Sequence, residues 1–356
     1  MKFTPCVLSL LLSSTASAKP LAHEHHMHKR DVVTVVHTVY ANGDLYTPPA
    51  ETADPAPQTA GINAPYAPAP DTTAAAAAGT SSAAAGAPSS DSSSSSGSGT
   101  SGLSFGAAIV YSPYSSSGGC KDANTIASEI AQLSAYDVIR IYGVDCNQVP
   151  NILSALASHQ KLFAGIFNMG SLSSDLATLK AGVESTSSWD KIFTVSIGNE
   201  LVNSGQQSAS SMVSYTNQGR SILRGYGYNG PVVTVDTFVA YYNNPSLCSG
   251  SDYIAANAHP YFDSTCSASD AGSWVQNHIS TLSSLCSGKS VIITETGWPS
   301  QGNANGAAVP SVSNQQAALS SINSLVKGQS IILSAFNELW KSPGSCGCEQ
   351  YWGVLD

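Results

Sequence analysis

Charged side chains are scarce in this sequence of 356 residues: Asp, Glu, Lys and Arg make up 10% of it, against about 25% in an ordinary soluble domain. Only 14 of them are basic, and 23 are acidic. We expect no nucleic-acid partner, because phosphate binding requires clustered lysines and arginines. The scarcity of charge also excludes a coiled coil, whose e and g positions are usually charged.

Long apolar runs are missing as well. After the first segment no stretch approaches the ~20 apolar residues of a membrane-spanning helix, and residues 352–356 form no hydrophobic tail of the kind that precedes a glycolipid anchor. We therefore expect neither a membrane span nor a glycolipid anchor. Cys346 and Cys348 lack a second pair of ligands at zinc spacing, and we expect no metal, no cofactor and a monomer.

What the sequence does contain begins with a secretory signal. Residues 1–18 have a basic start, an apolar centre at Val7–Leu12 and small residues before a cleavage point after Ala18. A dibasic pair, Lys29-Arg30, predicts a second cleavage that ends a propeptide at 19–30. The protein is thus expected to be secreted.

Secretion favours disulfide bonds. Seven cysteines remain beyond the signal, so that one thiol is expected to be free or paired with another molecule. Cys248, Cys266 and Cys286 are close enough in sequence for one local bridge, and the spacing leaves the pairing open.

Three zones of different composition follow the propeptide. Residues 31–45 are rich in valine and threonine and predict a short β-like segment. Residues 46–102 consist mostly of Pro, Ala, Ser, Thr and Gly, which predicts a disordered, O-glycosylated stalk or a bare flexible linker. Residues 103–356 form the folded domain.

The folded domain alternates apolar, β-branched runs with helical patterns. Eight runs read as buried parallel strands: 103–110, 138–143, 161–167, 192–198, 231–235, 252–258, 290–294 and 331–336. Eight strands in about 250 residues predict an α/β fold of the (β/α)8 TIM-barrel class. A doubly wound open sheet is the other arrangement, but it would usually carry a glycine-rich turn after its first strand, where this chain has Val110–Tyr114.

Active sites of such barrels lie at the C-terminal ends of the strands. Three of the six glutamates in residues 103–356, namely Glu200, Glu295 and Glu338, end or directly follow predicted strands. The fourth and seventh strands face each other across a barrel, so Glu200 and Glu295 are expected to oppose one another. Two opposed carboxyl groups perform glycoside hydrolysis, with retention at about 5 Å separation and inversion at about 6.5–9.5 Å.

Aromatic residues follow the predicted strands in unusual number. Flat aromatic faces pack on pyranose rings, and this set of ten predicts a sugar cleft: Tyr111, Tyr114, Tyr142, Phe238, Tyr241, Tyr242, Tyr261, Phe262, Trp298 and Trp340. His259, after the sixth strand, either lines this cleft or is structural.

At these residues the chain resembles glycoside hydrolase family 17, the endo-β-1,3-glucanases and β-1,3-glucanosyltransferases. The resemblance covers residues 103–356 and rests on five motifs in order: 139–142 (IRIY), 195–200 (VSIGNE), 294–300 (TETGWPS), 336–341 (FNELWK) and 351–354 (YWGV). It implies that Glu200 is the general acid/base and Glu295 the nucleophile of a retaining enzyme. Asn337 and Leu339 stand where plant members usually have Asp and Pro.

Together with the aromatic pattern, the resemblance implies a set of substrate-binding residues. These are Tyr142, Asn199, Tyr241, His259, Tyr261, Trp298, Glu338 and Lys341. Glu338 and Lys341 fall on the motif that supports the site in the family.

The N-terminal half is similar to that of fungal secreted cell-wall glucanases and mannoproteins of the same family. The expected function is a retaining endo-β-1,3-glucan hydrolase or transglucosylase whose partners are β-1,3-glucan and other components of the cell wall. The alternative is a structural wall mannoprotein or adhesin that binds glucan with little turnover.

Overall fold

The computed structural model describes residues 105–356. The predicted signal peptide (1–18), propeptide (19–30), β-like segment (31–45) and stalk (46–102) lie outside the described residues. Among those that are described, no helix is long and apolar enough to cross a membrane.

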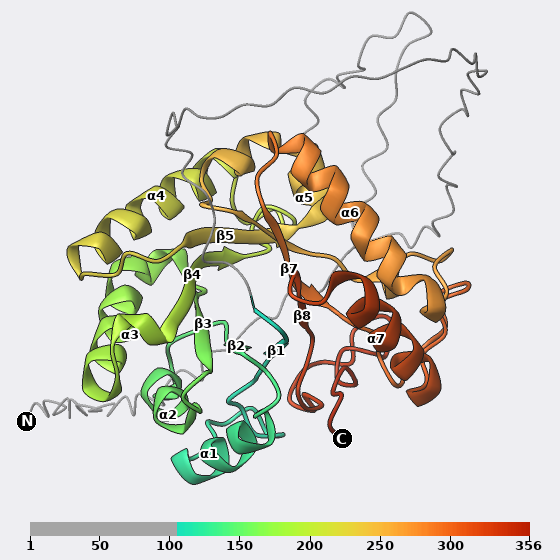
Figure 1. The fold of residues 1–356 in the computed structure, drawn as a ribbon, viewed down its shortest axis with the longest axis horizontal. Helices are drawn as coiled ribbons and strands as arrows, with labels where there is room; N and C mark the ends of the chain where they lie inside the picture. The colour runs from blue at the N-terminus through green and yellow to red at the C-terminus, as the bar shows by residue number, and fades with distance from the viewer. Residues whose placement is uncertain (1–104) are drawn as a thin grey trace, which may run out of the picture.

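Eight parallel strands close into a barrel in sequence order, so the predicted TIM barrel is confirmed (Figure 1). Each strand lies within or overlaps its predicted run. The bounds are β1 Ala108–Val110, β2 Val138–Arg140, β3 Lys161–Ile166, β4 Ile192–Asn199, β5 Val232–Thr237, β6 Ile254–Asn257, β7 Val291–Thr296 and β8 Ser330–Ile332.

Helices surround the barrel on the outside. The α-helices are α1 Ala123–Gln132, α2 Gln148–Ala155, α3 Leu172–Thr186, α4 Ala209–Gly225, α5 Phe238–Asn243, α6 Ala271–Leu285 and α7 Val312–Val326. Short 3₁₀ turns lie between them: η1 Met169–Ser171, η2 Trp189–Lys191, η3 Pro245–Ser249, η4 Pro260–Phe262 and η5 Ala268–Asp270. Asp122, Ser208 and Ser311 begin α1, α4 and α7 by accepting hydrogen bonds from the first-turn amides.

No helix follows β8 in the described part of the chain. Instead, residues 333–356 run as irregular backbone, and Figure 1 shows this segment, in red, between α7 and α1. It bonds to the seam where the barrel closes, because the Ala335 amide donates to the Val110 carbonyl at 2.8 Å. The segment also bonds to itself, from the Ser334 amide to the Trp352 carbonyl at 2.9 Å. β1 and β8 themselves share a single paired position, Ile109 with Ile332.

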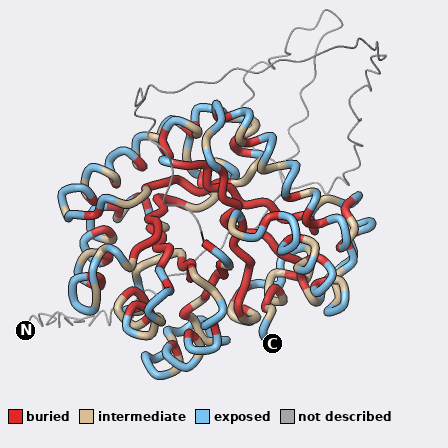
Figure 2. Tube along the Cα trace, in the orientation of Figure 1, coloured by how far each residue is buried: buried red, intermediate tan, exposed pale blue. Residues whose placement is uncertain are grey.

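The strands are buried on both faces, as the continuous apolar runs predict (Figure 2). Helices bury one stripe each and expose the other, which Figure 2 shows as alternating colours around the outer ring. Two buried residues of opposite charge on the apolar strands pair with each other: Arg140 on β2 is 1% exposed and Glu295 on β7 is 2% exposed. Because burying a charge is costly unless it is paired, these two positions mark the functional end of the barrel.

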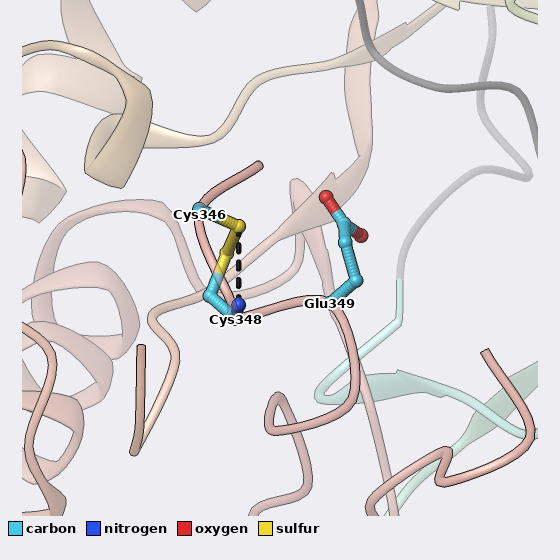
Figure 3. A group of neighbouring side chains, drawn as sticks. All are labelled: Cys346, Cys348 and Glu349. Atoms are coloured by element: carbon cyan, nitrogen blue, oxygen red, sulfur yellow. Dashed lines mark hydrogen bonds between the residues drawn. A yellow bond between two sulfur atoms is a disulfide. The ribbon is translucent and has the colours of Figure 1, made fainter. Parts of the chain in front are cut away.

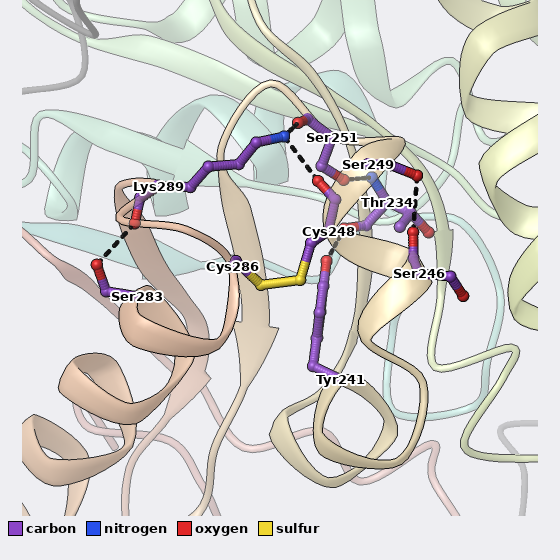
Figure 4. The surroundings of a disulfide bond; sticks show 9 residues. All are labelled: Thr234, Tyr241, Ser246, Cys248, Ser249, Ser251, Ser283, Cys286 and Lys289. Carbon is purple, nitrogen blue, oxygen red and sulfur yellow. Dashed lines mark hydrogen bonds between the residues drawn. A yellow bond between two sulfur atoms is a disulfide. The ribbon is translucent and has the colours of Figure 1, made fainter.

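Three disulfide bonds lie in the described residues: Cys120–Cys146, Cys248–Cys286 and Cys346–Cys348. Cys266 is buried and free, which agrees with the odd count of cysteines. The bridge Cys248–Cys286 joins η3 to the end of α6 (Figure 4). Beside it, the Lys289 ammonium group donates to the carbonyls of Cys248 and Ser251.

Candidate active site

Glu295 lies near the C-terminal end of β7, and its carboxylate is enclosed by donors. Its Oε1 accepts hydrogen bonds from the Tyr142 hydroxyl at 2.8 Å and from Arg140 Nη1 at 3.0 Å. On the other side, His259 Nε2 lies 3.3 Å from Oε2. A buried carboxylate with a guanidinium partner is stabilised in its ionised form, which is the form that a nucleophile needs.

Arg140 connects three strands across the barrel. One guanidinium nitrogen, Nη1, contacts Glu295 and the Thr294 carbonyl, the latter at 2.6 Å, while Nη2 donates to Asn199 Oδ1 at 2.8 Å. The guanidinium also lies 4.5 Å from the centre of the Tyr142 ring. The planar fork of an arginine suits such multiple contacts, so Arg140 fixes the end of β4 relative to β7.

Glu200 directly follows β4, and the backbone bends sharply to present it. The pairing of β4 with β5 shifts register between Ser196 and Asn199, as a β-bulge does. Gly198 has a φ of +79° and Glu200 a φ of +56°, and the left-handed region is uncommon for residues other than glycine. A Cβ on Gly198 would lie 2.6 Å from the Met212 side chain. The bend therefore requires glycine before the acid.

Asn257, at the end of β6, orients the Glu200 carboxyl group. Its amide nitrogen donates to Glu200 Oε1 at 2.8 Å and to Asn199 Oδ1 at 3.3 Å. The Thr294 hydroxyl donates to Asn257 Oδ1 at 2.8 Å, which fixes the orientation of the amide. Two chains of contacts thus link the glutamates: one through Asn257 and Thr294, the other through Asn199 and Arg140.

Burial and the adjacent Glu295 raise the pKa of Tyr142 well above its usual range. The phenol therefore keeps its proton near neutral pH and donates a hydrogen bond to the carboxylate. Glu338 also contributes to this shift of the Tyr142 pKa, which places its charge near the site. Glu338 and Lys341 lie three residues apart in an irregular turn and form a buried ion pair.

Three of the predicted substrate-binding aromatics are buried in the body of the domain. Tyr241 and Trp298 are 0% exposed and Tyr261 is 1% exposed. Their polar atoms donate to backbone carbonyls: Tyr241 to Thr234 at 3.1 Å, Tyr261 to Asn303 at 2.6 Å and Trp298 to Val309 at 3.1 Å. In this structure these rings support loops, and they offer no face to a ligand.

Other aromatic side chains remain accessible near the glutamates. Tyr142 is half-buried, and Phe262 is 39% exposed beside His259, with ring centres 6.0 Å apart. Trp352 packs on both rings, with its centre 5.1 Å from that of His259 and 6.0 Å from that of Phe262. His259 is itself 7% exposed and contacts Glu295, so the structure unites both readings of this residue: it is packed like a core side chain and it touches the site.

The site residues predicted from the sequence did not include Arg140, Asn257 or Asp236. Arg140 carried a signal, because an arginine inside an apolar strand of a charge-poor chain is unusual. Asn257 and Asp236 each stand at the end of a buried strand, as the glutamates do. The same positional rule applied to amides and aspartates would have included them.

One group of potential metal ligands occurs among residues 105–356, and it lies outside this site. Cys346, Cys348 and Glu349 approach one another (Figure 3). Cys346 and Cys348 are joined in a disulfide, and the Cys348 amide donates to the Cys346 sulfur. Sulfurs in a disulfide are not thiolates, the form that binds metals, so this group is not a metal site.

The geometry can now be compared with known proteins. A family model described as the BtgE/BtgC glycoside hydrolase domain matches residues 108–353. The chain belongs to glycoside hydrolase family 17. The sequence resemblance and the expected enzyme class are thereby confirmed.

Curated relatives of this family 17 hydrolase are fungal. It is 54% identical to "Cell surface mannoprotein MP65" of Candida albicans over 258 residues, 72% of this chain and 68% of the relative. It is 50% identical to "Probable family 17 glucosidase SCW4" of Saccharomyces cerevisiae over 69% of this chain and 64% of that protein. The chain therefore spans less than two thirds of the length of the second relative.

Among solved structures, the hydrolase is similar in fold to a family 17 β-1,3-glucanosyltransferase from Rhizomucor miehei. The TM-score is 0.61 at 23% identity, over 70% of this chain and 92% of the other. This likeness supports the barrel fold.

Proposed function

We propose that the protein is a retaining glycosidase of β-1,3-glucan in which Glu295 is the nucleophile and Glu200 the general acid/base. The observation that carries the proposal is the unequal environment of the two carboxyl groups. Glu295 is buried and paired with Arg140. Glu200 is half-buried and accepts a bond from the neutral amide of Asn257. None of the ion pairs within residues 105–356 involves Glu200.

This difference suits the two steps of a double displacement. In the first, a Glu295 oxygen bonds to the anomeric carbon while Glu200 passes its proton to the departing glycosidic oxygen. In the second, Glu200 takes a proton from an incoming hydroxyl, whose oxygen replaces Glu295 on the sugar. The Glu295 carboxyl group must therefore stay ionised, whereas the Glu200 carboxyl group must give a proton to the leaving group and take one from the acceptor.

The relatives support the substrate class and the location. The names of the relatives refer to a cell-surface mannoprotein and to a family 17 glucosidase, and the structural neighbour is named a β-1,3-glucanosyltransferase. We propose accordingly that this protein is secreted to the fungal cell wall and acts there on β-1,3-glucan. Water and a second glucan chain compete as acceptors for the same covalent intermediate, so hydrolysis and transfer are two outcomes of one site.

The test is incubation with laminari-oligosaccharides, with product lengths read by chromatography and the anomeric form by proton NMR. We expect β-configured products first, and products longer than the substrate if a glucan acts as acceptor. A 2-deoxy-2-fluoro laminaribiosyl donor should label Glu295, as located by peptide mass spectrometry. Glu184→Gln is the matched control, because Glu184 forms an exposed pair with Lys180 on α3. Products of α-configuration would refute the retaining mechanism, and a label on another residue would refute Glu295 as the nucleophile.

A second function is a structural wall mannoprotein that binds glucan with little turnover, which the name of the Candida albicans relative favours. It predicts that Glu200→Gln leaves glucan binding and wall integrity unchanged in cells. If that variant instead reproduces the defect of a deletion, catalysis is the function that matters.

A further inference from the structure

Asp236 is buried and takes no part in the proposed double displacement. It lies on β5, beside the end of β4, and is 1% exposed. Its Oδ2 accepts a hydrogen bond from the Val202 amide at 2.8 Å. Its Oδ1 accepts from the amides of Asn203 at 3.1 Å and Thr237 at 2.9 Å. The carboxyl group is thus occupied by backbone on both oxygens.

The first two of these amides belong to the turn that begins at Glu200. Glu200 has a φ of +56°, a conformation that a glutamate keeps only when its surroundings impose it. The Glu200 amide donates to the Val235 carbonyl at 3.0 Å, and the Ser204 amide donates to the Glu200 carbonyl at 3.0 Å. These contacts fix the backbone of Glu200 itself. Asp236 instead fixes Val202 and Asn203, which come two and three residues after Glu200.

We infer that Asp236 is the residue that positions Glu200: by gripping the amides of Val202 and Asn203, it holds the left-handed turn that aims the Glu200 carboxyl group at Asn257 and the glycosidic oxygen. The inference rests on the proposed acid/base role of Glu200. It makes Asp236 a positioning residue, which acts on the reaction through Glu200 and touches no substrate atom.

Electrostatics support the same relationship. Burial and the negative charge of Glu200 raise the pKa of Asp236 to about 7, while the backbone donors oppose the shift. From α5, the buried Tyr241 also faces Asp236, since the carboxylate contributes to the raised pKa of its phenol. A neighbouring negative charge disfavours ionisation of a carboxyl group, so the effect of Glu200 on Asp236 places the two within electrostatic reach of each other.

The test is Asp236→Asn in the full-length protein. Asparagine keeps the shape, but its NH₂ group cannot accept from a backbone amide. We expect kcat/KM on laminari-oligosaccharides to fall about 10–100-fold, because a misplaced general acid loses much of its contribution. On 2,4-dinitrophenyl β-laminaribioside, whose leaving group needs no proton, kcat/KM should stay within about twofold of the wild-type value.

The matched control is Asp137→Asn. Asp137 also accepts from two backbone amides, those of Gly106 and Ala107, but it precedes β2 and so lies at the opposite end of the barrel. This variant should change both substrates by the same small factor. Amide hydrogen exchange at Val202 and Asn203 should accelerate in Asp236→Asn and not in the control.

Four outcomes overturn the inference. Equal losses on both substrates would show that Asp236 only stabilises the fold, and unchanged exchange at Val202 and Asn203 would show that it does not hold the turn. If Asp236→Asn is normally active while Glu200→Gln is inactive, Asp236 has no positioning role, and the proposed function still stands. A wild-type protein inactive on every β-1,3-glucan would instead refute the proposed function, and this inference with it.

Discussion

The ends of β7 and β4 hold their glutamates in opposite ways. At β7 the strand pairing also shifts register beside Glu295, but no residue of the strand has a positive φ, and Glu295 is fixed through its side chain by Arg140, Tyr142 and His259. At β4 the backbone itself is irregular, and Glu200 is aimed by a bulge and a left-handed turn. Under the proposed roles, the comparison contrasts a nucleophile that is fixed through side-chain partners with an acid/base that is placed by its main chain and whose carboxyl group is oriented by Asn257.

The largest expected effect comes from the β7 side. Glu295→Gln removes the proposed nucleophile, and we expect kcat to fall by about 10⁴-fold or more, as for other enzymes that lose a nucleophile. Turnover of laminari-oligosaccharides measures it, and added azide should not restore the rate. If Glu295→Gln retains more than about a tenth of the activity, the nucleophile is another residue.

On the β4 side, Glu200→Gln should reduce kcat on glucan by about 10²–10⁴-fold, the usual contribution of general acid catalysis. Because the covalent intermediate still forms from substrates with good leaving groups, azide should accelerate turnover of the dinitrophenyl laminaribioside and give a β-glycosyl azide. NMR of the product is decisive here, since an α-azide would contradict the assignment of roles.

Arg140 links the two sides, and its loss should be seen in stability. Arg140→Met leaves the Glu295 carboxylate buried without its guanidinium partner, and we expect the free energy of unfolding to fall by about 3–5 kcal/mol. Urea denaturation measures the change. In the double variant Arg140→Met, Glu295→Gln most of this loss should disappear, and simple additivity of the two changes would argue against a stabilising charge pair.

The pH dependence of stability sharpens the comparison further. The pKa of Asp236 is raised to about 7 in the folded protein, whereas an aspartate in an unfolded chain titrates near 3.9. Between these values the folded state binds more protons, so the stability that this group contributes is full at about pH 4 and is lost as the pH rises through about 7. Melting curves of wild type and Asp236→Asn from pH 4 to pH 8 should therefore converge with rising pH. A gap that stays constant over this range would mean that Asp236 is ionised throughout.

The smallest effect is expected at Cys266. The thiol is 5% exposed, and burial raises its pKa to about 12, so it should not react with iodoacetamide in the native protein and should react once in urea. Mass spectrometry after alkylation counts the labelled thiols. Fast labelling of the native protein would revive the idea that this cysteine pairs with another molecule.

The strands and both glutamates could be predicted from the sequence because the chain has few other charged residues. Apolar runs predict buried strands, and a carboxylate at the end of such a run stands out in a chain with 10% charged residues. The contacts between strands were not readable in this way. Arg140 and Glu295 are 155 positions apart, and only the closed barrel brings them together.

Side-chain direction was the second limit. Tyr241 follows β5 in sequence, as a residue of a sugar site does, but it lies in α5. The helical turn points its ring back into the core, where its hydroxyl bonds to Thr234. A residue's place at the end of a strand therefore predicts its end of the barrel, but the local backbone decides whether it faces solvent.

The segment that follows β8 makes closure of the barrel and the position of Glu338 and Lys341 depend on the same residues. Residues 333–356 close the seam between β1 and β8, and the same residues contain Glu338 and Lys341. Asn337 Oδ1 accepts from the Gly353 amide at 3.0 Å, so the segment is folded back on itself while it spans the gap. Sealing the cylinder and completing its working end are thus one assembly event, which joins the beginning of the domain to its end. Enzymatic activity in a refolding experiment would therefore report when this junction forms, and it should appear only after the helices have gained their far-ultraviolet signal.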